Sequence, residues 1–210
     1  MSKPDTSIDP RILESAKAEF LSCGYEKAST NIICKKAGVT SGALYKRFAG
    51  KDELFCALVA PTAEEFKGML SSEQSNFHAM SEGEKESAAL GSASSGAGFI
   101  DYVYEHFDAF KLLIECSEGS SYGHYMEDMV EILVKSTEKF MAETNHEAVI
   151  LGKEATHETI HILISSYLYG LFEPVVHGMN LNDALVYTEQ LKYFFNVGWA
   201  DILRLKKQMP

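Results

Sequence analysis

The segment from Thr30 to Phe48 restricts the possible fold more than any other part of the sequence. The hydroxyl of Thr30 suits the start of a helix, and Ile32 and Ile33 supply an apolar face behind it. Gly38 suits the positive φ angle that ends a helix and begins a turn. This order of residues predicts a short helix, a tight glycine turn and a second short helix.

The second helix of this segment is expected to present a small, polar and basic surface. Thr40 or Ser41 can cap it, while Leu44 and Phe48 lie four residues apart and face inward. The residues left around the outside are Ser41, Ala43, Tyr45, Lys46 and Arg47. Such a face can enter the major groove of DNA, because small residues permit close approach and long polar ones reach bases and phosphates. The pattern favours a helix-turn-helix, although any small three-helix unit can contain a similar arrangement.

The flanking sequence supports the first of these two interpretations. Upstream, residues 11–23 carry apolar side chains at helical spacing, and Gly24 follows as a helix stop. Downstream, a further helix is predicted from Lys51, with Asp52 and Glu53 in its first turn, where the helix dipole favours carboxylates.

With this combination of residues the chain resembles the TetR family of bacterial transcriptional regulators. The residues that carry the resemblance are Phe20, Gly24, Tyr25, Thr30, Ala37, Gly38, Val39, Leu44, Tyr45, Phe48, Lys51, Asp52, Glu53 and Leu54. The resemblance implies an all-α protein with an N-terminal three-helix helix-turn-helix DNA-binding domain over residues 1–55. A larger C-terminal helical ligand-binding and dimerisation domain would occupy residues 56–210. Cys34 and Gly50 depart from the family pattern, but both are small enough to be accommodated.

The resemblance also implies which residues bind DNA. Thr30 and Lys51 would bind phosphates, and Tyr45 would lie against the DNA backbone. The complete candidate set is Thr30, Thr40, Ser41, Gly42, Ala43, Tyr45, Lys46, Arg47 and Lys51. Because Gly42 and Ala43 have no hydrogen-bonding side chains, base recognition would depend mainly on Lys46, Arg47 and Ser41.

The distribution of charge is consistent with a DNA-binding end on an acidic body. Residues 1–60 have a net charge of +2, whereas residues 61–210 have a net charge of −13, for a total of −11. The acidic majority would repel DNA, which excludes a protein that coats nucleic acid without selection. Most of the carboxylates are expected to be part of an ordinary solvated helical surface.

The sequence predicts a cytoplasmic protein without a membrane segment or a cofactor. The first ten residues lack the apolar stretch of a signal peptide, and we expect no apolar run to be long enough to span a bilayer. Four cysteines, Cys23, Cys34, Cys56 and Cys116, lie far apart without metal-binding spacing. They are expected to be reduced, with a redox-sensing role for one of them as the alternative.

The rest of the chain is predicted to be helical, with one polar connection over residues 71–98. This connection ends in the small-residue run at 91–98. Pro61 is expected either to bend the helix that begins at Lys51 or to end it, with a new helix from Thr62 to Leu70. A bend could transmit a change in the larger domain to the DNA-binding helices.

A ligand cavity is expected among aromatic and methionine side chains of the larger domain. One helical stripe runs from Phe99 to Cys116, and a second runs from Tyr122 to Phe140. Such stripes also form ordinary protein cores. The family resemblance implies a small-molecule effector here, of apolar or aromatic character, with the candidate contacts Tyr102, His106, Phe110, Tyr122, Tyr125, Met126, Met129 and Tyr167.

The last two helices are predicted at about Glu154 to His177 and Asn182 to Lys207. Their apolar faces are wide, and Phe172, Phe195 and Trp199 add further bulk. We therefore expect them to pair with a second copy of the chain. The resemblance likewise implies a homodimer, which would bind a palindromic stretch of double-stranded DNA.

One motif indicates a different chemistry. His157, Glu158 and His161 match the H-E-x-x-H pattern, in which two histidines hold zinc and the glutamate acts as general base. A third ligand at a recognised spacing is missing, although His106 and His124 are candidates from other helices. A zinc hydrolase and a metal-responsive regulator thus remain alternatives to ordinary surface histidines.

The sequence as a whole favours a DNA-binding repressor that is released by a ligand, and we expect no enzymatic activity and no metal site. A regulator of the same kind that activates transcription is an alternative. An adaptor protein that has lost DNA recognition is a further alternative, against which Lys46, Arg47 and Lys51 argue.

Overall fold

The computed structural model describes residues 8–89 and 96–205. These ranges contain ten α-helices and one short β-hairpin, which confirms the prediction of an all-α protein. The chain forms two compact units. The first comprises Met1–Glu65 with His106–Tyr125, and the second comprises Phe66–Glu105 with Met126–Pro210. The predicted domain boundary after residue 55 remains a prediction.

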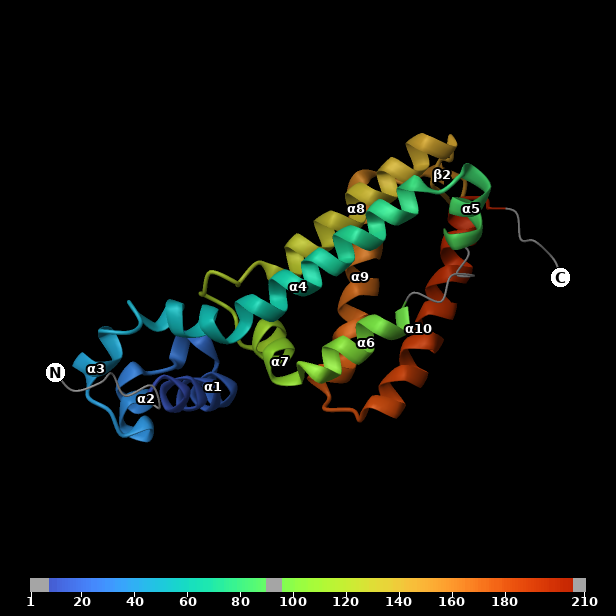
Figure 1. Ribbon diagram of the computed structural model, residues 1–210. Helices are drawn as coiled ribbons and strands as arrows, with labels where there is room; N and C mark the ends of the chain where they lie inside the picture. Colours follow the sequence, from blue (N-terminus) through green and yellow to red (C-terminus); the bar gives the residue numbers. More distant parts are fainter. Residues whose placement is uncertain (1–7, 90–95, 206–210) are drawn as a thin grey trace. The chain divides into compact units, whose positions relative to one another are not determined.

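The first unit contains the helices of the predicted DNA-binding domain together with α7, which lies outside the predicted range (Figure 1). These are α1 (Ile8–Lys27), α2 (Thr30–Ala37), α3 (Ser41–Tyr45), the beginning of α4 (Lys51–Ala79) and α7 (Phe107–Glu115). Helix α1 packs against both α2 and α7. The buried side chains of the unit include Ile12, Ala16, Phe20, Ile33, Leu44, Leu54, Phe55, Phe110 and Leu113.

An aromatic cluster connects α1 to α4 within this unit. The ring of Phe20 lies 5.2 Å from that of Phe55 and 5.9 Å from that of Tyr25, and Tyr25 lies 5.5 Å from Phe55. Gly24 makes the cluster possible, because its φ of 76° interrupts the helical path of α1 and returns Tyr25 toward Phe20. The predicted helix stop at this glycine is confirmed.

The second unit contains the remainder of α4 and the other helices. These are α5 (Glu82–Ser87), α6 (Gly96–Glu105), α8 (Tyr125–Thr144), α9 (His157–Val176) and α10 (Leu181–Ile202), with the strands β1 (Val149–Ile150) and β2 (Lys153–Glu154). Helix α10 packs against both α6 and α9. The ring of Phe66 on α4 contacts Phe99 and Tyr102 of α6 and Phe172 of α9, at centroid distances between 5.4 and 6.2 Å.

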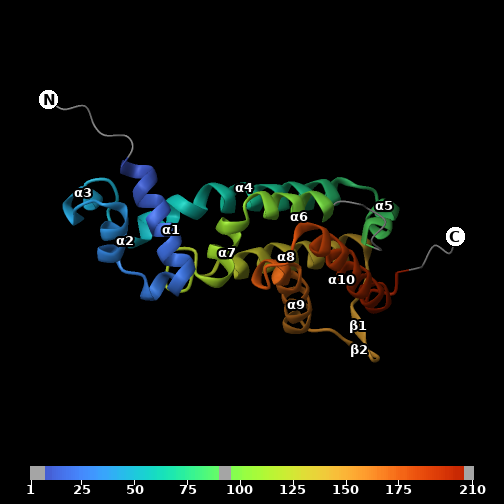
Figure 2. The same cartoon turned by 90° about the horizontal axis from the view of Figure 1, so that it is seen from below.

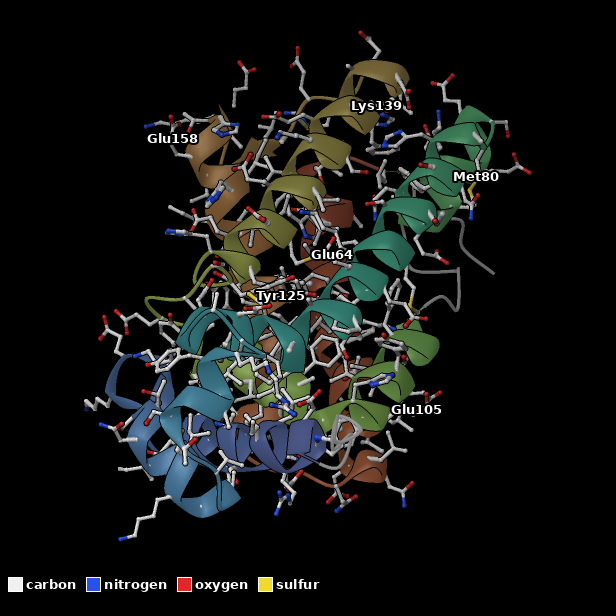
Figure 3. All side chains as sticks on the ribbon, turned by 60° about the vertical axis from the view of Figure 1, so that its left-hand side comes forward. Glu64, Met80, Glu105, Tyr125, Lys139 and Glu158 are labelled. Atoms are coloured by element: carbon white, nitrogen blue, oxygen red, sulfur yellow. The ribbon has the colours of Figure 1, made fainter. Side chains whose placement is uncertain are left out.

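Helices α4 and α8 run side by side in the same direction, and their far ends are marked by Met80 and Lys139 in Figure 3. A polar cluster joins them at this end. His78 Nε2 lies 2.9 Å from Ser136 Oγ, and His78 Nδ1 lies 2.8 Å from Glu143 Oε2. Ser136 also donates to the side-chain oxygen of Gln74, and Lys85 of α5 donates to Glu143 Oε2 over 2.9 Å. Both partners lower the pKa of Glu143 to about 2, Lys85 contributing most.

Helices α9 and α10 form an antiparallel pair. The hydroxyl of Tyr187 donates to the carbonyl of Gly170 over 3.0 Å, and the rings of Tyr167 and Phe195 lie 5.0 Å apart. Gly170 permits this contact, because a Cβ atom there would lie 3.1 Å from a methyl group of Leu191. The two long closing helices were predicted correctly. The expected end of the second, Lys207, lies outside the described residues.

A short hairpin precedes α9, and Figure 2 shows it standing apart from the helices of its unit. Val149 pairs with Glu154, and Ile150 pairs with Lys153. The two residues of the turn, Leu151 and Gly152, both have positive φ angles, and Leu151 is 99% exposed. The sequence predicts helix throughout this region, because two residues per strand are too few for an alternating pattern.

Of the two alternatives for Pro61, the helix end is excluded, because α4 continues through this proline. Two expectations about helix limits were wrong. Helix α4 extends to Ala79 across the first part of the expected 71–98 connection. Residues 82–87 of that connection form α5, while residues 90–95 lie outside the described part. The stripe from Phe99 to Cys116 is divided at His106, whose φ and ψ of −116° and 33° separate α6 from α7.

The expectation that no apolar run is long enough to span a bilayer was also wrong. One helix, α9, is long and apolar enough by length and composition alone. Helix α9 is 20 residues long with a mean hydropathy of 1.2 over its most apolar 18 residues. One third of that window is buried within the protein. Core helices of soluble proteins meet the same criteria, so this composition is weak support for a membrane segment.

Candidate nucleic-acid interface

The turn between α2 and α3 has the predicted geometry. Gly38 adopts φ 66° and ψ 37°, and its N–H donates to the last carbonyl groups of α2. Thr40 caps α3, since its hydroxyl accepts a hydrogen bond of 3.2 Å from the Ala43 N–H. Two details were wrong: Ser29, not Thr30, is the N-terminal cap residue of α2, and Ile32 is exposed while Ile33 is buried.

Helix α3 presents the predicted outward face, but it ends at Tyr45, before Lys46, Arg47 and Phe48, which were expected on the same helix. Leu44 is completely buried and holds the helix on the domain, whereas Ala43 is half-buried. The exposed residues of this segment are Ser41, Gly42, Tyr45 and Lys46. A surface with small residues at the start of the helix and a tyrosine and lysine at its end is suited to enter a groove and reach its edges.

Thr30 and Tyr45, both candidate contacts to the DNA backbone, lie next to each other. Thr30 Oγ1 is 3.3 Å from the hydroxyl of Tyr45, so the beginning of α2 and the end of α3 form one hydroxyl-bearing edge. Two adjacent hydroxyl groups can both donate to phosphate oxygens.

Lys51 is held at the start of α4 by α1. Its Nζ donates to the carbonyl of Glu26 over 3.0 Å and lies 4.4 Å from the centre of the Tyr25 ring. The cation is therefore positioned by an oxygen and an aromatic face, and it retains donors for an anion, since an ammonium group has three. Burial raises the pKa of Tyr25, and the nearby carboxylate of Asp52 adds to this effect.

Arg47 is the candidate that differs most from expectation. Its Nε forms an ion pair with Asp9 near the start of α1, and its Nη1 donates to the Ala43 carbonyl over 3.3 Å. Only 22% of its side chain is exposed. Sequence reasoning identified the arginine but missed its acidic partner, because no local pattern connects residues that are 38 positions apart.

The lysines of this surface differ in whether they already pair with a carboxylate. Lys36 pairs with Glu19 of α1, a buried carboxylate 2.8 Å away. Lys35 and Lys46 are both exposed, and neither takes part in an ion pair within the residues that the structure describes. These two lysines, with Lys51, are the cations of this surface that are most available to phosphate.

Polar contacts connect the DNA-binding helices with α7 and the turn that follows it. The N–H of Tyr25 donates to the Cys116 carbonyl over 2.9 Å, and Lys17 lies 3.1 Å from Asp108. The carboxylate of Asp52 accepts hydrogen bonds from the backbone and side chain of Ser121. Burial raises the pKa of Asp52, but these hydrogen bonds outweigh it and lower the pKa below its ordinary value.

The candidate ligand contacts are divided between the two compact units. His106, Phe110, Tyr122 and Tyr125 belong to the first unit, and Tyr102, Met126, Met129 and Tyr167 belong to the second. In the first unit, Tyr122 and Tyr125 lie beside α4, where their hydroxyls approach Glu64 and the Ala63 carbonyl at 3.5 and 3.4 Å (Figure 3). In the second unit, Tyr102 stacks on Phe66, and burial raises the pKa of Tyr167 to about 12.

The two histidines of the H-E-x-x-H motif have ring centres 6.4 Å apart, but they contact different carboxylates. His157 Nδ1 lies 2.6 Å from Glu138, and His161 Nε2 lies 3.7 Å from Glu131, so each has a different partner on α8. Among the described residues, no group of three or more histidine, cysteine, aspartate or glutamate side chains is arranged to hold a metal ion. The arrangement therefore does not support the zinc hydrolase or the metal-responsive regulator.

A second surface, here called the α9–α10 face, is apolar and uncovered in the single chain. Its most exposed large side chains are Ile162, Tyr169, Val186, Tyr193, Phe194 and Val197. Beside them is an open groove of about 410 Å³, lined by Leu163, Tyr193, Phe194, Phe195, Val197, Gly198, Trp199 and Ile202. Large exposed apolar patches of this kind mark interaction sites.

The helix-turn-helix geometry and its polar, basic face define a DNA-binding transcriptional regulator. Residues 12–58 match the family model described as bacterial regulatory proteins, tetR family. Residues 12–58 therefore carry a DNA-binding domain of the tetR type. Regulators of this family are soluble DNA-binding proteins and not enzymes, and they typically act as dimers with small-molecule ligands.

Solved structures share the fold over nearly the whole chain. A TetR-like transcriptional regulator from Rhodococcus sp. RHA1 is 18% identical with a TM-score of 0.56, covering 94% of this chain and all of the other. A transcriptional regulator from Aquifex aeolicus VF5 is 19% identical with a TM-score of 0.54, covering 90% and 98%. NalD from Pseudomonas aeruginosa is 19% identical with a TM-score of 0.50, covering 97% and 99%. A comparison with curated protein sequences finds no match.

Proposed function

We propose that this protein is a cytoplasmic transcriptional repressor that binds a palindromic operator as a homodimer and is released from it by a small molecule. The observation that carries the proposal is the outward face of α3, on which exposed small, aromatic and basic side chains surround a helix held by the buried Leu44. Repression would result from competition with RNA polymerase for the same DNA. NalD, which has the same fold, is described as the secondary repressor of the MexAB-OprM multidrug efflux pump.

The proposed DNA contacts follow from how exposed each candidate residue is and from which groups it already contacts. Lys46, exposed and without an ion pair among the described residues, is the candidate for base recognition, together with Ser41. Thr30 and Tyr45 would bind phosphates through the hydroxyl-bearing edge that they form. Lys51 would bind a phosphate with the N–H donors that its contact with Glu26 leaves available. Thr40, Gly42 and Ala43 would permit close approach of the helix backbone, as the family resemblance implies.

The proposed dimer forms through the α9–α10 face. Tyr193 and Phe194 are 74% and 71% exposed in the single chain, which is unfavourable for aromatic side chains in water. A second copy with the same face would cover them in an isologous contact. This contact also explains why α9 is apolar on more than one side. Two DNA-binding domains then read half-sites roughly 34–36 Å apart.

The proposed effector is a small apolar or aromatic molecule bound within the second unit, where Tyr102, Met126, Met129 and Tyr167 are the candidate contacts. Its effect would reach the DNA-binding helices through α4, in which Pro61 supplies no N–H to the carbonyl four residues earlier and so weakens the helix at that point. The contacts of Asp52 with Ser121 and of Tyr25 with Cys116 form a second mechanical connection. Ligand binding that favours one geometry of these contacts would shift the population away from the DNA-binding form.

The proposal is tested by selecting bound sequences from a pool of random duplex DNA at two salt concentrations. We expect a palindrome with half-sites about one helical turn apart. Lys46→Ala should relax selection at one or two base positions by about 1–3 kcal/mol. Lys153→Ala, which removes the same charge from the hairpin β1–β2, is the matched control and should recover the wild-type palindrome.

Two results would contradict the proposal. If a folded dimer selects no motif at either salt concentration, the protein is better described as an adaptor that has lost DNA recognition. If the recovered motif has a single half-site, the dimeric arrangement of the DNA-binding domains is wrong, although DNA recognition remains.

A further inference from the structure

The contact between Asp9 and Arg47 has no role in the function proposed above, although it lies at the end of the DNA-binding surface. Asp9 belongs to the first turn of α1, and Arg47 lies two residues beyond Tyr45, the last residue of α3. The two are joined by an ion pair between Nε of the arginine and Oδ1 of the aspartate. That oxygen is closed off from solvent and has no hydrogen-bond donor in good geometry, so the guanidinium is the group that balances its charge.

The same contact determines where the guanidinium is located. Arg47 is held from two sides, by Asp9 through Nε and by the Ala43 carbonyl through Nη1. Its side chain is 22% exposed, whereas the adjacent Lys46 is exposed and has no ion pair among the described residues. Two consecutive cations of one DNA-binding segment thus differ in their availability to DNA.

A carboxylate is a chemical competitor of phosphate for arginine. Both anions present oxygen atoms that accept from the same N–H groups of the guanidinium. The contacts with Asp9 and Ala43 leave the N–H groups of Nη2 for other acceptors, but the carboxylate already neutralises the positive charge of the guanidinium. The net gain in affinity from this arginine is small as long as Asp9 is ionised.

We propose that Asp9 is a positioning residue that withholds Arg47 from DNA and thereby lowers the affinity of the protein for DNA of any sequence. Selection of the operator then depends on the other groups of the interface, Lys46 in particular. The proposal rests on the proposed function, because it assumes that the α3 face binds duplex DNA. It reverses the expectation from the sequence that Arg47 is one of the main base-reading residues.

The magnitude follows from counter-ion release. One additional phosphate contact on duplex DNA increases the slope of log K against log salt by about 0.9, which corresponds to about fivefold in affinity at 0.15 M salt. Asp9→Asn has nearly the same shape and removes the charge. We expect it to add one such contact for each subunit, both for random-sequence duplex and for operator.

The experiment measures the salt dependence of binding to a duplex of random sequence by four proteins: wild type, Asp9→Asn, Arg47→Ala and the double variant. Glu14→Gln is the matched control, since it removes one carboxylate from an exposed position of the same helix, where Glu14 pairs with Lys17. We expect a steeper slope for Asp9→Asn only. Arg47→Ala alone should leave the wild-type slope unchanged, and the double variant should resemble it.

Three results would overturn the proposal. The first is an equal gain for Asp9→Asn and Glu14→Gln, which would indicate a general effect of net charge. The second is a gain for Asp9→Asn that persists in the Arg47→Ala background. The third is a loss of slope in Arg47→Ala alone, which tests the proposal even if the Asp9 variant fails to fold. Failure of the proposed function is recognised separately, since the wild-type protein would then select no operator.

Discussion

Replacement of Phe194 by alanine tests the α9–α10 face most directly. Phe194 is 71% exposed, and a phenylalanine contributes about 200 Å² of surface, so about 140 Å² is available for burial by a partner. At about 25 cal/mol per Å², this area corresponds to about 3.5 kcal/mol. An isologous dimer contains the side chain twice, which gives an upper value of about 7 kcal/mol.

The measured effect should be smaller than this upper value. Alanine retains part of the contact, and buried area converts incompletely into affinity because side chains lose freedom on association. We expect about half, or about 3 kcal/mol, which corresponds to a dissociation constant of the dimer increased by at least a hundredfold. The fold of the single chain should be unaffected, since the side chain is mostly in solvent.

Sedimentation equilibrium over a range of protein concentrations provides the dissociation constant of the dimer. Leu151→Ala is the matched control, because Leu151 is even more exposed but lies on the hairpin outside the α9–α10 face. Its dissociation constant should equal that of the wild type. The reasoning is refuted if Phe194→Ala associates as tightly as the wild type, or if both variants weaken association equally.

Three further predictions concern stability. Leu44→Ala removes a completely buried side chain beneath α3 and should lower the free energy of unfolding by about 2–5 kcal/mol in urea titrations, and a loss below 1 kcal/mol would contradict the packing described here. Gly38→Ala should cost about 1 kcal/mol or more because φ is 66°, whereas Gly42→Ala, with open space around its Cβ position, should be neutral or stabilising in thermal unfolding; equal effects would rule out the turn geometry. Glu143 has its pKa lowered from 4.5 to about 2 in the folded state, so its contribution to stability is present above pH 4.5 and is lost as the pH falls through about 2. The difference in stability between wild type and Glu143→Gln should therefore disappear over this range, and a difference that is constant with pH would show that the carboxylate charge is not involved.

The helix-turn-helix could be predicted because its determinants are local. A glycine at the end of one helix and a hydroxyl at the start of the next act through atoms within four residues, so Gly38 and Thr40 were correctly assigned. The apolar spacing likewise identified Leu44 as buried. The error at Ile32 arose because a helix of eight residues has too few turns to distinguish its buried side from the adjacent side.

The extension of α4 could not be predicted from composition. Residues 71–79 are rich in serine and polar side chains, which alone favour a loop. They are helical because Phe77 packs 5.6 Å from Phe140 and because His78 bonds to two residues of α8. Both contacts join residues about 60 positions apart, and packing between distant segments commonly overrides local preference.

The contact partners of the predicted functional residues could not be predicted from the sequence for the same reason. Helical periodicity indicates which side of a helix is buried but not which helix covers it, so the candidate ligand contacts were assigned to one cavity although they belong to two compact units. The pairing of His157 and His161 with different glutamates of α8 was equally invisible in the motif. Asp9 carries no signal at all, since an aspartate near a helix start is ordinary.

The cluster around His78 has a consequence for the short helix α5. A helix of six residues is not stable by itself in water, so α5 needs attachment to its neighbours. Its buried Lys85 supplies one such attachment, because Nζ donates to the carboxylate of Glu143 on α8. The same carboxylate contacts His78 of α4, so one side chain of α8 holds both neighbouring helices. Loss of Glu143 would therefore free α5 and the end of α4 together.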